Sequence, residues 1–474
     1  MNSSDCFQKG GYNMSKTENK SAQTLRRNLT LFEATMYSIS FVIGSGIFMK
    51  PATVLNATGS SGLSLILWIG GGLISLASAL AIAEVASNIP KLGGQYAYVN
   101  ELYGPFFAYI YGWISVLISC PAGGAASSIL TATLLSGFIP MSDVMVKVTA
   151  VAVLWFLTGI QMITTKGSMK IQVAGTIGKL VPIFLIVIVG LVTTGGAGTP
   201  INMSAVGDPA KASMAGALLG VLWAFDGWVA VTTLGAELKD PAKNLPKSIA
   251  MSLIFITAVY AIFNVVAFKH LTPAELIAIA AAGKSVGVEV AVKLFGNVGA
   301  IILTVGMLVS VATTNNAQIM NGARSTLAMA RRNQLPGSVL LRKLHPKFDT
   351  PYMSLLFYAI VSMIYILSGT FDSTTDLVVF IVWIFFIATT FGVFIIRRNP
   401  DKYPNREKLY KVPLYPITPI VGIVGGAYIL FETVRGAPVN AMIGAAVVAV
   451  GIPIYMYLKK FYKDTPIEEE EAPV

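Results

Sequence analysis

Two glycines interrupt the first long apolar segment of the chain, in the stretch Ser40-Phe41-Val42-Ile43-Gly44-Ser45-Gly46-Ile47-Phe48. A later apolar segment is interrupted in a similar way, at Leu222-Trp223-Ala224-Phe225-Asp226-Gly227-Trp228. Glycine inside a helix costs about 1 kcal/mol relative to alanine, and the break frees backbone amides and carbonyls that need other partners. Both segments are therefore expected to be broken helices.

These segments belong to a chain with the composition of a membrane protein. It has 474 residues, of which 54% are hydrophobic and 12% charged, and its mean hydropathy is +0.69. Soluble domains carry roughly 25% charged residues. A helix needs roughly 20 apolar residues to cross the hydrocarbon core, where open strands would leave backbone groups without partners. The composition predicts an all-α membrane protein and argues against an ordinary soluble enzyme.

Twelve apolar segments are long enough to be transmembrane helices. We expect them at residues 31–55, 63–87, 105–137, 145–164, 171–193, 213–236, 249–268, 294–323, 352–369, 377–396, 414–434 and 440–458. Most of the 34 lysines and arginines fall in connections on the side of the N-terminus, which is the cytoplasmic side by the positive-inside rule. We expect a multi-pass protein in the lipid bilayer of the cell membrane, with both termini in the cytoplasm.

The remaining composition excludes several classes of function. The net charge of +11 is explained by the topology, so it does not predict a nucleic-acid partner. Only Cys6 and Cys120 are present, and His270 and His345 fall on opposite faces, so we expect no disulfide framework, metal site or cofactor. We also find no nucleophile paired with a base and no phosphate-binding loop, so we expect no enzyme.

The two broken segments occupy corresponding places in the chain. Each is the first span of a possible half of five spans. Paired interruptions of this kind are typical of inverted repeats with a substrate site near the membrane midplane. Glycines that merely allow close helix packing are the alternative explanation.

Several motifs in a fixed order resemble one transporter family over nearly the whole chain. They are Ile43-Gly44-Ser45-Gly46-Ile47-Phe48, Pro90-Lys91-Leu92-Gly93-Gly94-Gln95-Tyr96-Ala97-Tyr98, Tyr103-Gly104-Pro105, Trp223 to Trp228, Glu237 with Pro241, Asn244 and Pro246, and Tyr410-Lys411-Val412-Pro413. Together they resemble the amino acid, polyamine and organocation transporter superfamily. Within it, they are most similar to the L-type amino acid transporter branch and its bacterial serine/threonine exchangers.

The resemblance implies a LeuT-like fold, with five helices, their inverted copy and two further helices. We expect the repeats at 29–193 and 194–398 and the two further helices at 399–460. Residues 1–28 are polar and lack periodicity and residues 461–474 are acidic, so we expect a disordered cytoplasmic N-terminus and an acidic cytoplasmic tail. One difference concerns the loop from Phe138 to Asp143, which lacks the cysteine by which animal L-type subunits bind a glycoprotein. We expect no disulfide-linked heavy-chain partner.

The breaks offer what an amino acid zwitterion needs. Amides at the start of the outer half-helix, near Ser45 and Gly46, suit a carboxylate because they add to the positive end of the helix dipole. Free carbonyls near Ile43, Trp223 and Phe225 suit an ammonium, and the resemblance implies the same tasks. The expected substrate-binding residues are Ile43, Gly44, Ser45, Gly46, Trp223, Phe225, Asp226 and Gly227.

Two of these residues have further expected roles. The resemblance makes Trp223 the aromatic gate over the substrate, with a packing or interfacial tryptophan as the alternative. Asp226 is costly at the depth of the bilayer, by at least about 2.5 kcal/mol at a helix centre, so an accident of structure is a poor explanation. It either binds a cationic side chain or organises the broken segment.

Lys179 lies nine residues into the fifth expected span, where a lone ammonium also costs about 2.5–3.5 kcal/mol. Snorkelling to the cytoplasmic side is the alternative. The resemblance implies that this lysine replaces the sodium ion that bridges the first and eighth spans in sodium-coupled relatives. We expect it to reach the carbonyls around Gly44, with Ser310 or Thr313, as a surrogate for that cation.

Other polar residues suggest secondary roles. Glu84 and Glu237 lie at cytoplasmic ends of spans and are interpreted as gate or capping residues. Asn315, Asn316 and Gln318 form a polar stripe that either lines the path or joins helices by hydrogen bonds. The outer connection from Lys269 to Val292 contains the apolar stretch 276–282, which predicts a short helix and a candidate lid.

We therefore expect a transporter of small neutral L-amino acids that works by alternating access, as a sodium-independent exchanger or by proton-linked uptake. A carrier of cationic amino acids or polyamines is the alternative favoured by Asp226. A channel or a nutrient sensor on a transporter fold is the alternative from another class.

Overall fold

The computed structural model describes residues 29–44, 46–89, 94–163, 166–194, 198–203, 213–234, 238–348, 350–368, 371–436 and 438–462. In these ranges the secondary structure is helical, apart from turns and one isolated bridge between Leu29 and Leu238. The chain is an all-α protein, as its composition predicts.

The helices follow the apolar segments of the sequence closely. Their bounds are α1 Leu31–Val42, α2 Gly46–Thr58, α3 Ser61–Asn88, α4 Gln95–Tyr103, α5 Pro105–Ile114, the π-helical turn η1 Ser115–Ser119, α6 Cys120–Ser136, α7 Asp143–Ile163, α8 Lys166–Val192, α9 Met214–Phe225, the 3₁₀ helix η3 Trp228–Leu234, α10 Pro241–His270, α11 Pro273–Ala281, α12 Val286–Arg331, α13 Ser338–Leu341, α14 Tyr352–Ser368, α15 Phe371–Arg398, α16 Ile417–Gly436 and α17 Pro438–Phe461.

Many of these helices are long and apolar enough to cross a bilayer. Within the described ranges eight pass this test, and α1 with α2 makes a ninth if the pair, bent by 46°, is one span. The helices Tyr352–Ser368 and Ile417–Glu432 are apolar but shorter. The structure thus agrees with a multi-pass membrane protein, while the count of twelve spans stays a prediction.

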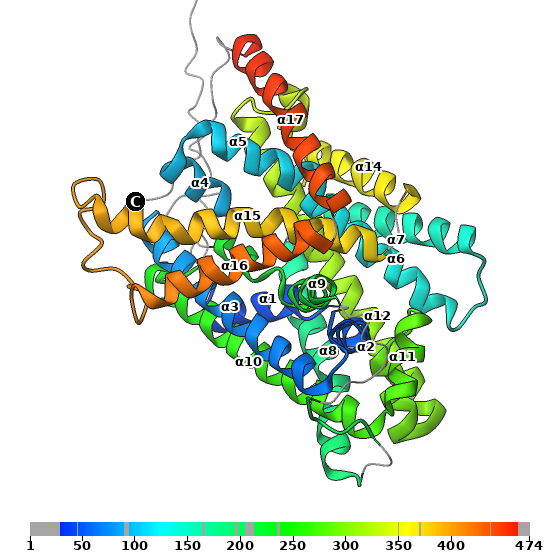
Figure 1. Cartoon of the computed structure of the whole chain (residues 1–474). Coiled ribbons are helices and arrows are strands. Elements are labelled where there is room, and N and C mark those ends of the chain that lie inside the picture. The colour runs from blue at the N-terminus through cyan, green and yellow to red at the C-terminus, as the bar shows by residue number, and fades with distance from the viewer. Residues whose placement is uncertain are drawn as a thin grey trace, which may run out of the picture.

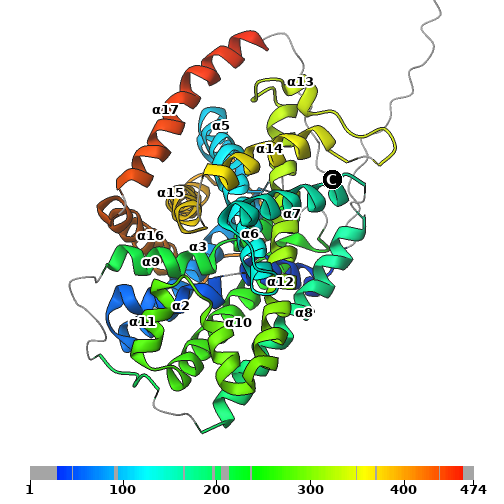
Figure 2. The ribbon, with the colours of Figure 1, turned by 90° about the vertical axis from the view of Figure 1, so that its right-hand side faces the viewer.

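The helices pack as two groups that contact each other through α12 and through two further long helices, α8 and α15 (Figures 1 and 2). In the first group α10 packs along both α1 and α3, and α2 packs along α9. In the second group α6 packs against α7, α12 and α14. α8 contacts α1, α10 and α12, and α15 contacts α3, α6 and α9, so each of the two helices contacts both groups.

The short connecting helices were only partly expected. α11 confirms the prediction of a helix in the outer connection. α4 was not predicted, because its sequence has little apolar periodicity. Gly94 and Gly104 bound it with φ of 54° and 90°, and the buried side chains of Tyr96, Tyr98 and Val99 hold it on the protein.

Candidate functional site

The first break separates α1, which ends at Val42, from α2, which begins at Gly46. It lies where the glycines of the first segment predict it. Gly46 approaches the other broken segment so closely that an added Cβ would lie 2.5 Å from the Cα of Ala224. Only glycine fits at this contact, because real Cβ atoms do not approach that closely.

The second break follows α9 and is formed by Asp226 and Gly227 before η3 begins. Gly227 has φ of 104°, a conformation that side chains other than glycine rarely adopt. Packing also requires a glycine at this position, because an added Cβ would lie 2.3 Å from the ring of Phe41 in α1. Each break therefore packs directly against the helix that carries the other.

Tyr260 of α10 ties the two breaks together. Its hydroxyl lies 2.9 Å from the carbonyl oxygen of Ala224 and 3.3 Å from that of Val42. Both carbonyls come from the last turn of a half-helix, where no backbone amide follows at the helical spacing. A single buried side chain thus supplies a polar partner to both helix ends.

A small cavity lies between the breaks, which we call the central cavity. Its volume is about 20 Å³, enough for about one water molecule. It is lined by Phe41, Val42, Gly44, Gly46, Ser127, Trp223, Asp226, Val311, Thr314 and Gln318. Four expected site residues, Gly44, Gly46, Trp223 and Asp226, therefore meet at one place, although they come from distant parts of the sequence.

The carbonyls at the end of α1 find donors from other helices. The amide of Ile43 closes the last helical bond, to the carbonyl of Ile39, at 2.8 Å. The carbonyl oxygens of Ser40 and Ile43 lie beyond this bond, and the ammonium of Lys179 donates to them at 2.5 and 2.6 Å. Lys179 therefore binds the carbonyl end of the broken helix.

Two hydroxyls of α12 complete this arrangement, which we call the Lys179 network. Lys179 Nζ lies 3.4 Å from Thr314 Oγ1, which is 3.3 Å from the carbonyl oxygen of Ser40. Ser310 Oγ lies 3.4 Å from the carbonyl oxygen of Ile43. Since Lys179 belongs to α8, the network joins three helices.

The electrostatics of this network favour a cation. Lys179 is fully buried, so its ammonium has lost its hydration and depends on protein oxygens. The end of α1 provides these, and the negative end of a helix dipole adds to the attraction. The buried position and the inward contacts differ from those of a lysine that snorkels to the membrane surface.

Some expected residues lie elsewhere than in the cavity. Phe225 is buried at 1% exposure, with its ring centroid 5.1 Å from that of Tyr260. The carbonyl of Ile43 already has two donors, Lys179 and Ser310, which argues against its binding a substrate ammonium. Thr313 donates to the carbonyl of Val309 at 2.6 Å, and its neighbour Thr314 joins the network instead. Ser45 lies outside the described residues.

The structure also adds residues to the cavity that the sequence did not single out for the site. Phe41 and Val42 belong to the turn before the first break, so their closeness to Gly44 in the sequence could have identified them as site residues. Ser127 of α6 and Val311 of α12 carried no such signal. A serine or valine inside an apolar span is common, and only packing shows which ones face the breaks.

The polar stripe on α12 joins helices by hydrogen bonds, and one of its residues lines the central cavity. Asn315 Nδ2 donates to Ser128 Oγ of α6 at 2.8 Å, and Gln161 Nε2 of α7 donates to Asn316 Oδ1 at 2.5 Å. These two asparagines join helices, whereas Gln318 lines the central cavity.

Glu84 forms a buried ion pair at the far end of α3 from the breaks. Its two carboxylate oxygens accept from Nε and Nη2 of Arg397, both at 2.8 Å, and the amide of Val412 donates to it at 2.6 Å. The guanidinium also stacks on Tyr415, 3.8 Å from the ring centroid. The other expected gate residue, Glu237, lies outside the described residues.

Known proteins are similar in sequence to this chain over nearly its full length. The profile of the amino acid permease family matches residues 29–458. The serine/threonine exchanger SteT of Bacillus subtilis (strain 168) is 32% identical over 437 residues, which cover 92% of this chain and 98% of the exchanger. The large neutral amino acids transporter small subunit 2 of Homo sapiens is 30% identical over 453 residues, covering 93% and 82%.

A third relative, the Asc-type amino acid transporter 1 of Mus musculus, is 30% identical over 452 residues, which cover 93% of this chain and 83% of that protein. These matches confirm the resemblance to the L-type branch and its bacterial exchangers. Because the family profile spans almost the entire helical part of the chain, the protein belongs to the amino acid permease family and is a membrane transporter of amino acids, not an enzyme.

Proposed function

We propose that this protein exchanges small neutral L-amino acids across the cell membrane without sodium. The Lys179 network carries this proposal, because a fixed ammonium binds the carbonyls of the first break, where a mobile cation would otherwise be needed. Relatives named as a serine/threonine exchanger and as a large neutral amino acids transporter support the substrate class.

In the proposed mechanism the breaks hold the two charged ends of the substrate. Backbone amides at the start of α2, near Ser45 and Gly46, bind the carboxylate at the positive end of that half-helix. Carbonyls at the end of α9, near Trp223 and Phe225, accept from the ammonium, and the side chain of Trp223 closes the site. Gly46 and Gly227 allow the broken segments to pack closely, and Gly44 and Asp226 line the space between them.

The size of the central cavity fits a closed state of an alternating-access cycle. A space for about one water molecule cannot hold an amino acid, so the half-helices must separate before substrate enters. We propose that α2 and α9 move apart to open the site toward one side of the membrane. The other two half-helices of the breaks, α1 and η3, move apart to open it toward the other side. The inverted halves 29–193 and 194–398 would give the two openings similar geometry.

The decisive experiment measures radiolabelled serine uptake into proteoliposomes that contain the purified full-length chain. We expect equal initial rates in sodium and choline media, and stimulation by unlabelled serine inside the liposomes. Sodium-dependent uptake by the unmodified protein would reject the role given to Lys179. Uptake that needs a proton gradient and no internal amino acid would replace exchange by proton-linked transport.

Variants of Lys179 test the network itself. Lys179→Met keeps most of the side-chain length but removes two charge-assisted hydrogen bonds, and Lys179→Ala also removes the bulk. We expect both to slow exchange at least about tenfold, equivalent to roughly 1.4 kcal/mol in the barrier. Lys269→Ala is a matched control, because that lysine donates to a backbone carbonyl, of Leu191, at an exposed position. Full-speed exchange by Lys179→Met contradicts the proposal.

Asp226 is the one observation that favours cationic amino acids or polyamines, because its carboxylate lines the central cavity. If it binds a cationic side chain, Asp226→Asn weakens arginine uptake and spares serine uptake. If it orders the break, the variant weakens both. Transport of arginine or a polyamine by the unmodified protein, with none of serine, threonine or alanine, would reject the leading proposal.

A channel and a sensor would each give a different flux in the same liposomes. Exchange gives a rate that saturates with serine concentration and rises with internal substrate. A channel gives flux that does not saturate, and a sensor gives binding without flux. The same preparation therefore separates these classes.

We also propose that the chain works without a disulfide-linked partner. The loop from Phe138 to Asp143 has no cysteine, and Cys120 is buried in α6. Transport by the purified chain alone is the expected outcome, and activity that appears only with a copurified second protein is the contrary one.

A further inference from the structure

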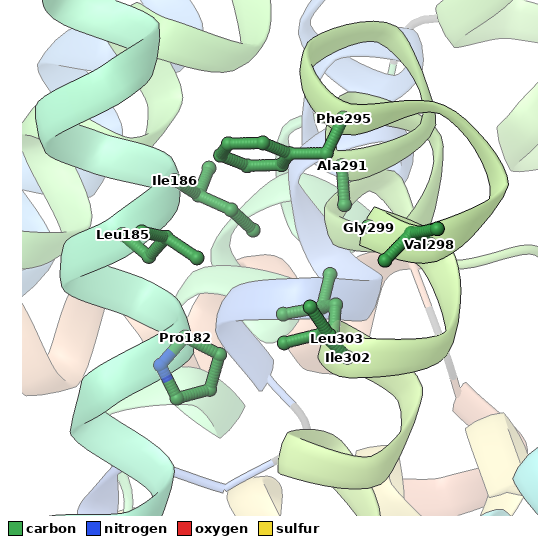
Figure 3. Close-up of a pocket in the computed structure, with 9 residues that line it drawn as sticks. All are labelled: Pro182, Leu185, Ile186, Ala291, Phe295, Val298, Gly299, Ile302 and Leu303. Atoms are coloured by element: carbon green, nitrogen blue, oxygen red, sulfur yellow. The ribbon is translucent and has the colours of Figure 1, made fainter.

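An apolar crevice separates part of α8 from the first half of α12 (Figure 3). Pro182, Leu185 and Ile186 line it from α8, and their side chains point toward those of Ala291, Val298 and Leu303 on α12. Its volume is about 280 Å³, far larger than that of the central cavity. We call it the lateral crevice.

The lateral crevice opens to the outer surface of the helix bundle. At its mouth Leu185, Val298 and Ile302 are 40%, 65% and 49% exposed, while Ala291 and Leu303 at its inner wall are each 1% exposed. Both helices pass the length and hydropathy test for a membrane span. The mouth therefore faces the hydrocarbon of the bilayer.

The residues that line the lateral crevice determine which kind of molecule can bind there. The lining side chains are aliphatic or aromatic, and water is stable in a cavity only where it finds two to four polar partners. An apolar cavity of roughly 150 Å³ stays dry and takes up benzene, so this larger one has room for a longer hydrocarbon segment. We propose that the lateral crevice is a binding site for one acyl chain of a membrane phospholipid.

The backbones of both helices determine the shape of the lateral crevice. α12 is interrupted at Gly296, which has φ of 65° and ψ of −156°, so the helix changes direction beside the crevice. At the inner end α8 and α12 touch, because Pro182 packs so closely on Gly306 that a Cβ there would lie 2.5 Å from the proline ring. The two helices approach each other again at Gly190, where an added Cβ would lie 3.5 Å from Leu294 of α12, so the crevice lies between two contacts.

The position of the site links the acyl chain to the transport machinery. Pro182 lies one helical turn after Lys179, on the helix that carries the ammonium. Leu303 and Phe48 both lie within 3.5 Å of the place where a side chain of Gly287 would be, so the inner wall of the crevice adjoins α2. An acyl chain in the crevice therefore contacts α8 and α12, two of the three helices that the Lys179 network joins, and lies next to α2.

Photolabelling tests the site directly. The full-length protein is reconstituted in nanodiscs that contain a phospholipid with a diazirine midway along one acyl chain, irradiated and analysed by peptide mass spectrometry. We expect adducts at Leu185, Val298 and Ile302 to exceed those at Ile188 at least threefold. Ile188 is a matched control, because it is 59% exposed on α8 but does not line the crevice.

Two variants fill the space with protein. Ala291→Phe places a ring at the inner wall, and Val298→Phe narrows the mouth at an exposed position where folding is not at risk. Each should lower crevice labelling at least threefold and leave labelling of Ile188 unchanged. Even labelling of all lipid-facing positions, or unchanged labelling in the correctly folded Val298→Phe protein, overturns the proposal. Labelling by a diazirine fatty acid but not by the phospholipid would overturn the choice of occupant.

Discussion

At the scale of single residues, the two glycines of the first break differ in how much space surrounds them. A Cβ on Gly44 would meet Thr314 at 3.5 Å, an ordinary contact, whereas a Cβ on Gly46 would meet Ala224 at 2.5 Å. Packing therefore leaves room for a small side chain at Gly44 and none at Gly46. The closest approach of the two breaks occurs at Gly46.

We predict that Gly46→Ala abolishes most serine exchange and lowers stability by about 1–3 kcal/mol, the usual cost of overpacking. Gly44→Ala should keep stability within about 0.5 kcal/mol, as substitutions without special strain do. Thermal unfolding in detergent and proteoliposome uptake measure the two effects. Equal stability of both variants contradicts the packing argument.

From the sequence, the types of residue in the site were easier to predict than the contacts between them. A lysine deep in a span must find oxygens, and the broken first span was the place that offered them. The choice between Thr313 and Thr314 depends on helix rotation, which turns the side-chain direction by about 100° per residue. Likewise, the donors that occupy the Ile43 carbonyl come from α8 and α12, so only tertiary packing shows them.

At the scale of elements, Glu84 and Arg397 join α3 to α15 and to the connection that follows α15. The carboxylate has an exposed fraction of 4%, and the amide of Val412 also depends on it. We predict that Glu84→Ala destabilises the protein by about 3 kcal/mol, because Arg397 then keeps a partly buried charge without this partner. Thermal unfolding in detergent measures this loss.

A neighbouring surface pair supplies the control for this prediction. Lys402 pairs with Glu101 at 2.9 Å but is 53% exposed, so Lys402→Gln should cost no more than about 1 kcal/mol. If the two variants unfold at the same temperature, the Glu84 pair is no stronger than an exposed one.

The short helix α11 offers a pH-dependent element outside the spans. Thr272 and Glu275 form a capping box, and Lys293 lies 2.6 Å from the Glu275 carboxylate. Lys293, with the Thr272 amide, holds the pKa of Glu275 below its ordinary value of 4.5. Because the folded pKa is the lower one, this stabilisation is complete above pH 4.5 and is lost as the pH falls through the folded pKa.

We predict that hydrogen-exchange protection of α11, corrected for the intrinsic rate, is constant from about pH 7 to pH 5 and falls below about pH 4.5. Glu275→Gln should lose this dependence on pH. Protection of α11 in the unmodified protein that stays constant down to pH 3 argues against the assignment.

Element boundaries were predictable to the extent that hydropathy determines them. Apolar runs located the long helices, the pair Gly44 and Gly46 located the first break, and Asp226 with Gly227 located the second. α4 was missed because its stability comes from tyrosines that pack on other helices, and not from an apolar face. The change of direction at Gly296 was equally invisible, since glycine inside a span usually serves close packing.

At the scale of the whole molecule, the proposed topology places the N-terminus in the cytoplasm. Cys6 lies in the N-terminal segment and the other cysteine, Cys120, is buried. We predict that a membrane-impermeant maleimide labels Cys6 in inside-out vesicles and not in intact cells. Cys6→Ser should remove the label. Equal labelling of intact cells would reverse the assigned orientation.

The proposed role of Lys179 in place of a mobile cation has a consequence for what drives the transport cycle. Moving one elementary charge across 100 mV is worth about 2.3 kcal/mol, and a coupled ion delivers that work only if it is released on the other side. The charge of Lys179 is covalently attached and never leaves the protein. Swapping one zwitterion for another then moves no net charge, so the membrane voltage does no work on the exchange. The composition of the two amino acid pools alone sets its direction.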